Sequence, residues 1–143
     1  MNKINCILLI DDNSDDNEFH EIIIQEAGVC NCVRTAENGV KGLEYLTKSV
    51  DPANQQDYPK PDLIFLDINM PRMNGFEFLE AYNKLDDSHK AKAVICMLTT
   101  SLNPDDKKKA LAMGAVSEFQ QKPLTEEMLK YIVQKYFSND AKG

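Results

Sequence analysis

An aspartate follows directly on a strongly apolar run: residues 63–66 are all apolar, and Asp67 comes next. A charge at the end of a buried run is costly to desolvate, so its presence there indicates a chemical role. Two more acids, Asp11 and Asp12, end the apolar run near the N-terminus. Near the C-terminus, Lys122 follows a weaker strand-like segment. These residue types indicate chemistry in which acids and a lysine act on one ligand.

Three carboxylates in one pocket repel one another unless some take up protons or a cation neutralises them. Carboxylate oxygens and water suit a hard cation, and Mg²⁺ takes such ligands. With the charge neutralised, Asp67 would be a nucleophile that accepts a phosphoryl group as an acyl phosphate. Lys122 can pair with one phosphoryl oxygen, and the hydroxyl of Thr99 can hydrogen-bond another. The protein would then act by positioning and charge neutralisation.

The elements that must position these side chains alternate between strand-like and helix-like patterns. Near-continuous apolar runs predict buried parallel strands, and helical spacing of apolar residues predicts helices between them. Strands are expected at 4–10, 32–36, 63–66, 93–98 and 117–121, and helices near 19–27, 39–46, 76–83, 104–113 and 125–136. Strict alternation of five strands with five helices predicts an α/β fold, a doubly wound parallel sheet flanked by helices on both faces.

Ligands of open α/β sheets bind beyond the carboxyl ends of the strands. Polar residues follow four of the predicted strands, and they are therefore expected at one rim of the sheet. They are Asp11-Asp12, Asp67, Thr99-Thr100 and Lys122-Pro123. Alone, Asp11-Asp12 would be read as a helix cap. Together with Asp67 and Lys122 on the same rim, the pair favours a metal site.

The first helix carries a stripe of apolar residues at helical spacing, namely Phe19, Ile22, Ile23 and Ala27, and Gly28 is its expected stop. Neither histidine has the neighbours that a metal ligand would need. We therefore expect His20 and His89 to be surface residues. Residues 48–61 are polar with three prolines and predict a loop that is longer than most.

Composition limits the class of protein. A chain of 143 residues fits one domain, and a net charge of −7 disfavours nucleic acid and anionic membranes as partners. The N-terminal apolar run is too short for a signal peptide, and no run approaches transmembrane length, so we expect a cytoplasmic protein. The spacing of the four cysteines is not that of a zinc site, and free thiols are expected.

The segments LIDDN, LDINMPRMNG, MLTTS and QKPL occur in this order along the chain. Each is weak alone, but the set at these intervals resembles a response-regulator receiver domain of the chemotaxis-receiver type. The resemblance covers essentially the whole chain. It implies a flavodoxin-like strand order of 2-1-3-4-5 and a single receiver domain over 1–143, with a core at about 4–137. No output domain is expected.

The resemblance also implies roles for the acidic residues. Asp67 matches the phosphoacceptor. Asp12 matches a direct metal ligand, and Asp11 the neighbouring acid that acts through water. Asn69, two residues after the acceptor, matches the position that gives the metal its backbone carbonyl. The implied cofactor is Mg²⁺.

Further along the chain, Thr99 matches the switch hydroxyl, with Thr100 as the alternative, and Phe119 matches the switch aromatic. Lys122 matches the phosphoryl-binding lysine, and the family pattern implies a cis bond between Lys122 and Pro123. Phe119 as an ordinary core residue is a competing interpretation. One departure stands out: the segment from Gly114 to Lys122 looks one residue longer than usual. A bulge or an altered helix end would accommodate the extra residue.

The predicted function is therefore a phosphorylatable receiver of a two-component or phosphorelay system. The implied partners are a histidine kinase or a histidine phosphotransfer protein and a downstream protein target, with a phosphorylation-dependent homodimer also implied. One alternative is an interaction module that keeps the fold and signals without phosphate. A second is a phosphatase that uses Asp67. Enzymes of the haloacid dehalogenase type usually place a second acid two residues after the nucleophile, where this chain has Asn69, so we expect no enzyme.

Overall fold

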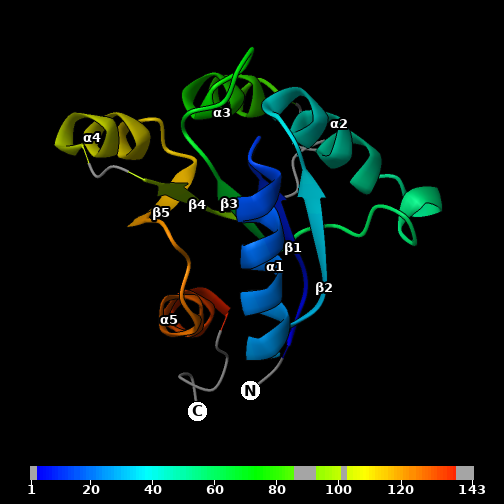
Figure 1. Cartoon of the computed structure of the whole chain (residues 1–143). Helices are drawn as coiled ribbons and strands as arrows, with labels where there is room; N and C mark the ends of the chain where they lie inside the picture. The colour runs from blue at the N-terminus through cyan, green and yellow to red at the C-terminus, as the bar shows by residue number, and fades with distance from the viewer. Residues whose placement is uncertain (1–2, 86–92, 101–102, 138–143) are drawn as a thin grey trace.

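The computed structural model describes residues 3–85, 93–100 and 103–137. Strands and helices alternate along the chain, as the sequence predicts (Figure 1). The strands are β1 (Ile4–Ile10), β2 (Cys30–Ala36), β3 (Leu63–Leu66), β4 (Val94–Thr99) and β5 (Val116–Gln121). The α-helices are α1 (Ser14–Ala27), α2 (Gly39–Ser49), α3 (Gly75–Asn83), α4 (Pro104–Ala112) and α5 (Glu126–Phe137). A short 3-10 helix, η1 (Pro52–Asn54), lies between α2 and β3.

The five strands form one parallel sheet in the order β2-β1-β3-β4-β5. The predicted fold class and strand order are confirmed. Helices cover both faces, with α1 and α5 on one side and α2, α3 and α4 on the other (Figure 1). Because every strand runs the same way, their carboxyl ends meet at one edge of the sheet.

Two hydrophobic cores sandwich the sheet. On the α2–α3–α4 side, Leu8 and Ile64 pack against Phe78 and Leu79. On the other side, Ile7 and its neighbours pack against residues of α1 and α5, including Ile24, Leu129 and Ile132. All four residues of β3 are buried, which explains why its sequence is apolar without alternation. This central strand ends at Asp67 and carries it into the rim.

Asparagines cap four of the helices. Asn13, Asn38, Asn74 and Asn103 each accept a backbone N–H of the following turn. Asn74 forms a full capping box with Glu77, whose side chain accepts the N–H of Asn74. These caps begin the helices directly after the strand-end loops, and so they set where the rim residues lie relative to the helices.

The apolar stripe predicted for α1 is only partly the buried one. Phe19 is 48% and Ile22 47% exposed, whereas Ile24 is fully buried. The expectation that His20 is a surface residue is wrong, because its side chain is 3% exposed. The second histidine of that prediction, His89, lies outside the described residues.

Two further predictions concern the chain as a whole. All four cysteines are free thiols. Among the described residues, no helix combines the length and apolar character needed to cross a bilayer.

Candidate functional site

Four strands deliver polar side chains to one edge of the sheet. Asp11 follows β1, Asp67 follows β3, Thr99 ends β4 and Lys122 follows β5. Backbone hydrogen bonds continue beyond the strand ends: the N–H of Asp67 donates to the Ile10 carbonyl at 3.0 Å, and that of Lys122 donates to the Thr99 carbonyl at 2.6 Å. The sheet therefore holds these side chains at a common rim.

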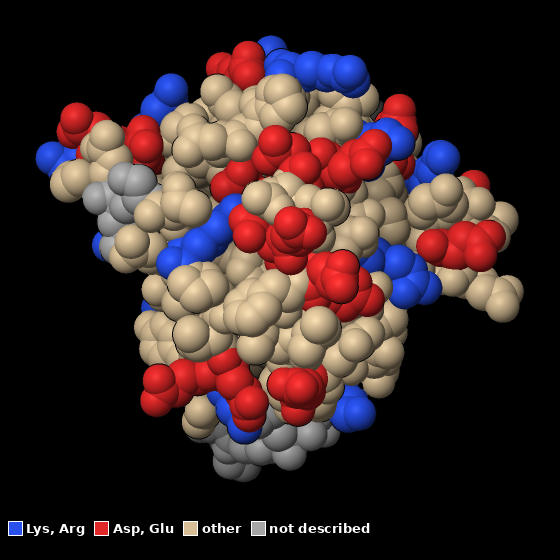
Figure 2. Space-filling model, in the orientation of Figure 1, with Lys and Arg blue, Asp and Glu red and all other residues tan. Residues whose placement is uncertain are grey.

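Asp11, Asp12 and Asp67 form a cluster in which one carboxylate oxygen of each lies within 4.8 Å of the others. Asp11 is 5% and Asp67 7% exposed, while Asp12 is exposed and leaves the cluster open to solvent. Figure 2 shows acidic side chains gathered around the N-terminal end of α1. Oxygen donors alone, partly buried and partly open to water, suit a hard cation such as Mg²⁺.

The Lys122 ammonium points into this cluster. Its Nζ lies 2.6 Å from Asp11 Oδ2, 2.9 Å from Asp16 Oδ2 and 3.4 Å from Asp67 Oδ1. The Lys122 side chain is 9% exposed, so these contacts occur largely out of water. The Lys122–Pro123 peptide bond is cis, as the resemblance implies.

Burial and neighbouring charges shift the pKa values of two groups in the cluster. Burial, followed by the charge of Asp11, raises the pKa of the Asp67 carboxyl to about 6, although Lys122 opposes the change. For Lys122 itself burial lowers the pKa, but the hydrogen bonds to Asp11 and Asp16 outweigh it, and the net pKa lies above the ordinary value. One ammonium does not neutralise the acids, so these residues fit a further cation.

Sequence reasoning missed the contribution of α1. Besides Asp16, which reaches Lys122, Asn17 donates from Nδ2 to the Asp11 carbonyl at 2.9 Å. His20 Nε2 accepts the backbone N–H of Leu124 at 3.3 Å. Burial and then the Lys122 charge lower the pKa of His20, which suits a neutral ring that accepts there. The available signal was spacing, since residues 16, 17, 20 and 24 share one helical face.

The extra residue near the C-terminus is taken up by a bulge. Ile95 pairs with Val116 but Cys96 pairs with Glu118, so Ser117 lies between two consecutive pairings. Regular pairing then resumes as far as Thr99 and Gln121. The bulge was one of the two predicted accommodations. It lies before Phe119, so the register that leads to Lys122 is regular.

The structure separates the two threonines at the end of β4. Thr99 is 1% exposed, whereas the side chain of Thr100 faces solvent. Phe119 is 8% exposed and belongs to the core on the α4 side. It also lines a hollow of about 340 Å³ beside Asn103, Pro104 and Lys107. Phe119 is therefore both a core residue and part of the lining of a surface hollow.

The loop after Asp67 lies beside the acidic cluster. Asn69 is exposed. Pro71 and Arg72 line an open hollow of about 380 Å³ that also touches Asp12. Arg72 has a φ of 68°, which L residues adopt rarely. The loop closes where the N–H of Gly75 donates to the Ile68 carbonyl at 2.8 Å.

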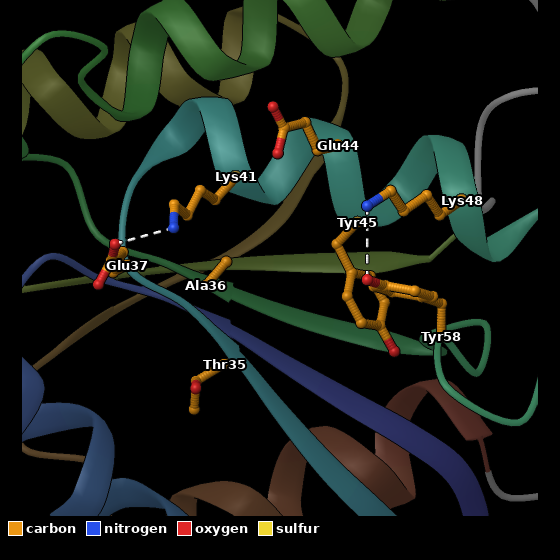
Figure 3. Close-up of a pocket in the computed structure, with 8 residues that line it drawn as sticks. All are labelled: Thr35, Ala36, Glu37, Lys41, Glu44, Tyr45, Lys48 and Tyr58. Atoms are coloured by element: carbon orange, nitrogen blue, oxygen red, sulfur yellow. Dashed lines mark hydrogen bonds and ion pairs between the residues drawn. The ribbon is translucent and has the colours of Figure 1, made fainter. Parts of the chain in front are cut away.

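A further hollow, of about 430 Å³, lies away from the acids, beside the edge strand β2. Figure 3 shows Tyr45 and Lys48 of α2 reaching towards Tyr58 of the loop before β3, with Lys41 paired to Glu37 at the other end. Its lining mixes acids, lysines and tyrosines and holds none of the predicted site residues.

Residues 7–134 match the model of the family described as the response regulator receiver domain. The chain belongs to this family. Receiver domains are the signalling modules of two-component systems, and they are generally not enzymes. Receiver domains bind Mg²⁺ at a cluster of aspartates, and this receiver domain has the acidic group Asp11, Asp12 and Asp67. Histidine kinases and phosphotransfer proteins are the partners with which receiver domains interact.

Similar proteins and structures include two-component response regulators and a chemotaxis protein. The receiver domain is 39% identical over 123 residues to the two-component response regulator ARR17 of Arabidopsis thaliana, covering 82% of this chain and 75% of the relative. A two-component response regulator from Cytophaga hutchinsonii is 30% identical with a TM-score of 0.79, over 93% of this chain and 96% of that one. The chemotaxis protein CheY4 of Vibrio cholerae is 31% identical with a TM-score of 0.70, over 92% and 98%.

Proposed function

We propose that this receiver domain accepts a phosphoryl group on Asp67 from a histidine kinase or a histidine phosphotransfer protein. One observation carries the proposal: the buried carboxylate of Asp67 shares a cluster with two other acids, one of them exposed, and the Lys122 ammonium lies 3.4 Å from its Oδ1. A nucleophilic carboxylate, donors for a cation and a fixed ammonium are the parts that phosphoryl transfer needs.

Mg²⁺ would be held by Asp12, by Asp67 and by the backbone carbonyl of Asn69, with Asp11 acting through water. When bound, the ion neutralises charge on the transferring group. The raised pKa of Asp67 supports this assignment, because burial and then the charge of Asp11 disfavour its ionised form, and a bound cation would offset both. Asp12 is the exposed member of the cluster and would meet the incoming ion first.

In the transfer step, a carboxylate oxygen of Asp67 forms a bond to phosphorus while the bond from phosphorus to the donor nitrogen breaks. Lys122 would donate to one phosphoryl oxygen and the hydroxyl of Thr99 to another. Thr99 and Lys122 are neighbours at the rim, since the backbone N–H of Lys122 donates to the Thr99 carbonyl. The step needs no proton taken from Asp67, because the carboxylate attacks in its ionised form.

The output would follow from movement of Thr99 towards the new charge. Phe119 lies two residues before the end of β5 and lines the hollow beside Asn103 and Pro104 at the start of α4. A shift of Thr99 and Lys122 would bias two arrangements of the α4–β5–α5 surface, which a downstream protein or a second copy of the chain would read.

The bulge weakens the alternative of a phosphate-independent module. The extra residue was its support, and the structure takes up this residue before Phe119, so that Gln121 still pairs with Thr99. We expect no turnover of external phosphomonoesters, because Asn69 stands where the related phosphatases have an acid.

The test uses acetyl phosphate with Mg²⁺ and intact-protein mass spectrometry. The wild-type chain should gain the mass of one phosphoryl group, and the Asp67→Asn variant should gain none. Asp57→Asn, an exposed acid in the loop before β3, is the matched control and should behave as wild type. An unmodified wild-type chain, or label persisting in Asp67→Asn, would contradict the proposal.

A further inference from the structure

We propose that Asp16 is a positioning residue that holds the Lys122 ammonium on the α1 side of the site and so restrains it from the phosphoryl group on Asp67. The inference rests on the proposed function and adds a device that sets how strongly the chain retains the phosphoryl group. Nothing in the sequence motifs assigned a role to Asp16, which lies in the first turn of α1.

The distances order the three partners of Lys122. Asp11 is nearest at 2.6 Å, Asp16 follows at 2.9 Å, and Asp67 is the most distant at 3.4 Å. The first two contacts are also hydrogen bonds. The ammonium therefore lies closer to Asp11 and Asp16 than to Asp67, although it remains paired with all three.

Asp16 is held in place by its helix. Its backbone N–H donates to the Asn13 side chain at 3.0 Å, which fixes the first turn of α1. The next residue, Asn17, anchors the same turn by its bond to the Asp11 carbonyl. The Asp16 side chain is 36% exposed, so solvent weakens its pull on Lys122 without removing it.

The two acids that hold Lys122 differ in what happens when a cation binds. Asp11 belongs to the cluster of acids that can share an ion, and a dication bound there would compete with Lys122 for the Asp11 carboxylate. Asp16 is not a member of that cluster. With the cation bound, Asp16 remains as a restraint on Lys122, opposing the attraction of the phosphoryl oxygens.

This restraint predicts the direction in which a change at Asp16 shifts the stability of the phosphorylated state. Removing the Asp16 charge frees one N–H of Lys122 to bond a phosphoryl oxygen. The phosphorylated state is therefore stabilised relative to the unphosphorylated state. Because Asp16 is partly exposed, we expect an effect of about two- to fivefold in an equilibrium constant. Asp15, its neighbour in the same first turn, is exposed, so it offers a variant with the same change in net charge.

The probe is beryllofluoride, a phosphoryl mimic that adds to a carboxylate, titrated by calorimetry at saturating Mg²⁺. Asp16→Asn should bind it about two- to fivefold more tightly than wild type does, whereas Asp15→Asn should bind it as wild type does. Asp16→Ala, which also removes the acid, should follow Asp16→Asn. Equal binding by Asp16→Asn and Asp15→Asn, or weaker binding by Asp16→Asn, would overturn the inference.

A second measurement asks whether the effect runs through Lys122, in Mg²⁺-free buffer and without any phosphoryl mimic. Urea unfolding of Asp16→Asn, Lys122→Met and the double variant forms a cycle, and the combined shift in stability should be smaller than the sum of the single shifts. Additive shifts would contradict the contact. If wild type binds no beryllofluoride, the proposed function fails. If wild type binds and Asp16→Asn matches Asp15→Asn, only the role of Asp16 fails.

Discussion

Gly75 passes so close to Asp67 that a Cβ on the glycine would stand 2.7 Å from the Asp67 carbonyl oxygen. The same Cβ would lie 2.8 Å from the end of the Met97 side chain. The first turn of α3 therefore closes directly onto the backbone of the phosphoacceptor candidate. An atom added here must displace backbone, which yields less readily than a side chain.

Gly75→Ala tests this close approach. We expect a loss of about 1–3 kcal/mol of unfolding free energy, because the methyl group is forced into a packed site. Urea unfolding gives the loss, and Mg²⁺ affinity should fall with it. Gly39→Ala is the control, since its Cβ would meet the flexible Met73 side chain instead of backbone. An equal loss in both variants would show that contact with the Asp67 backbone is not the cause.

The pKa of Asp67 predicts a pH dependence of stability. Its folded pKa is about 6 against an ordinary 3.8. Folding thus favours the protonated carboxyl, and this contribution is complete below the ordinary value and disappears as pH rises through the folded value. In EDTA, wild type should lose up to about 3 kcal/mol relative to Asp67→Asn between pH 4 and pH 8.

Urea unfolding of both proteins at several pH values checks this expectation. Added Mg²⁺ at pH 8 should restore stability to wild type more than to Asp67→Asn, because the ion compensates the ionised carboxyl. A stability difference between the two proteins that stays constant from pH 4 to pH 8 would contradict the raised pKa.

The bulge predicts that two single-residue deletions differ. Removing Ser117 should leave β5 regular and keep Lys122 at the rim, at the cost of the hydrogen bond from Tyr136 Oη to the Ser117 carbonyl. Removing Gln120, which lies between Phe119 and Lys122, shifts the register at the site itself. Beryllofluoride binding should persist in the first deletion and vanish in the second. Loss of binding in both would show that the bulge positions the site.

A hydrogen bond from Tyr45 predicts that this residue stabilises the loop before β3. Its hydroxyl donates to the Pro59 carbonyl at 2.6 Å, and the side chain is buried. Tyr45→Phe should cost about 1 kcal/mol and raise deuterium uptake in peptides covering residues 50–62. Tyr58→Phe removes only a 3.4 Å contact with Lys48 and serves as the control. Unchanged uptake in Tyr45→Phe would mean that the loop is held by other contacts.

The sequence predicted the sheet and the rim because their signals are local. A run of apolar residues such as 63–66 has one stable place, a strand buried on both faces, and the acid after it must leave the core. Since parallel strands end at a common edge, the order of the motifs was enough to bring Asp11, Asp67 and Lys122 together.

The sequence did not predict correctly which face of α1 is buried. Phe19 and Ile22 looked like its buried face, but the helix turns Asn17 and His20 inward, because the carbonyl of Asp11 and the N–H of Leu124 need partners there. The spacing of apolar residues along a helix does not show that a buried polar group of another element needs a hydrogen-bond partner from that helix.

By itself, the sequence determined the alternation of elements, the residues at the strand ends and the presence of an extra residue before Lys122. Only the tertiary structure decided that this residue is Ser117 in a bulge, that His20 is buried and that Asp16 holds the lysine. The reason is physical: Asp16 and Lys122 are 106 residues apart, and their contact depends on how α1 is laid against the end of β5. Local patterns carry information about burial, whereas such pairings arise only when the elements have packed.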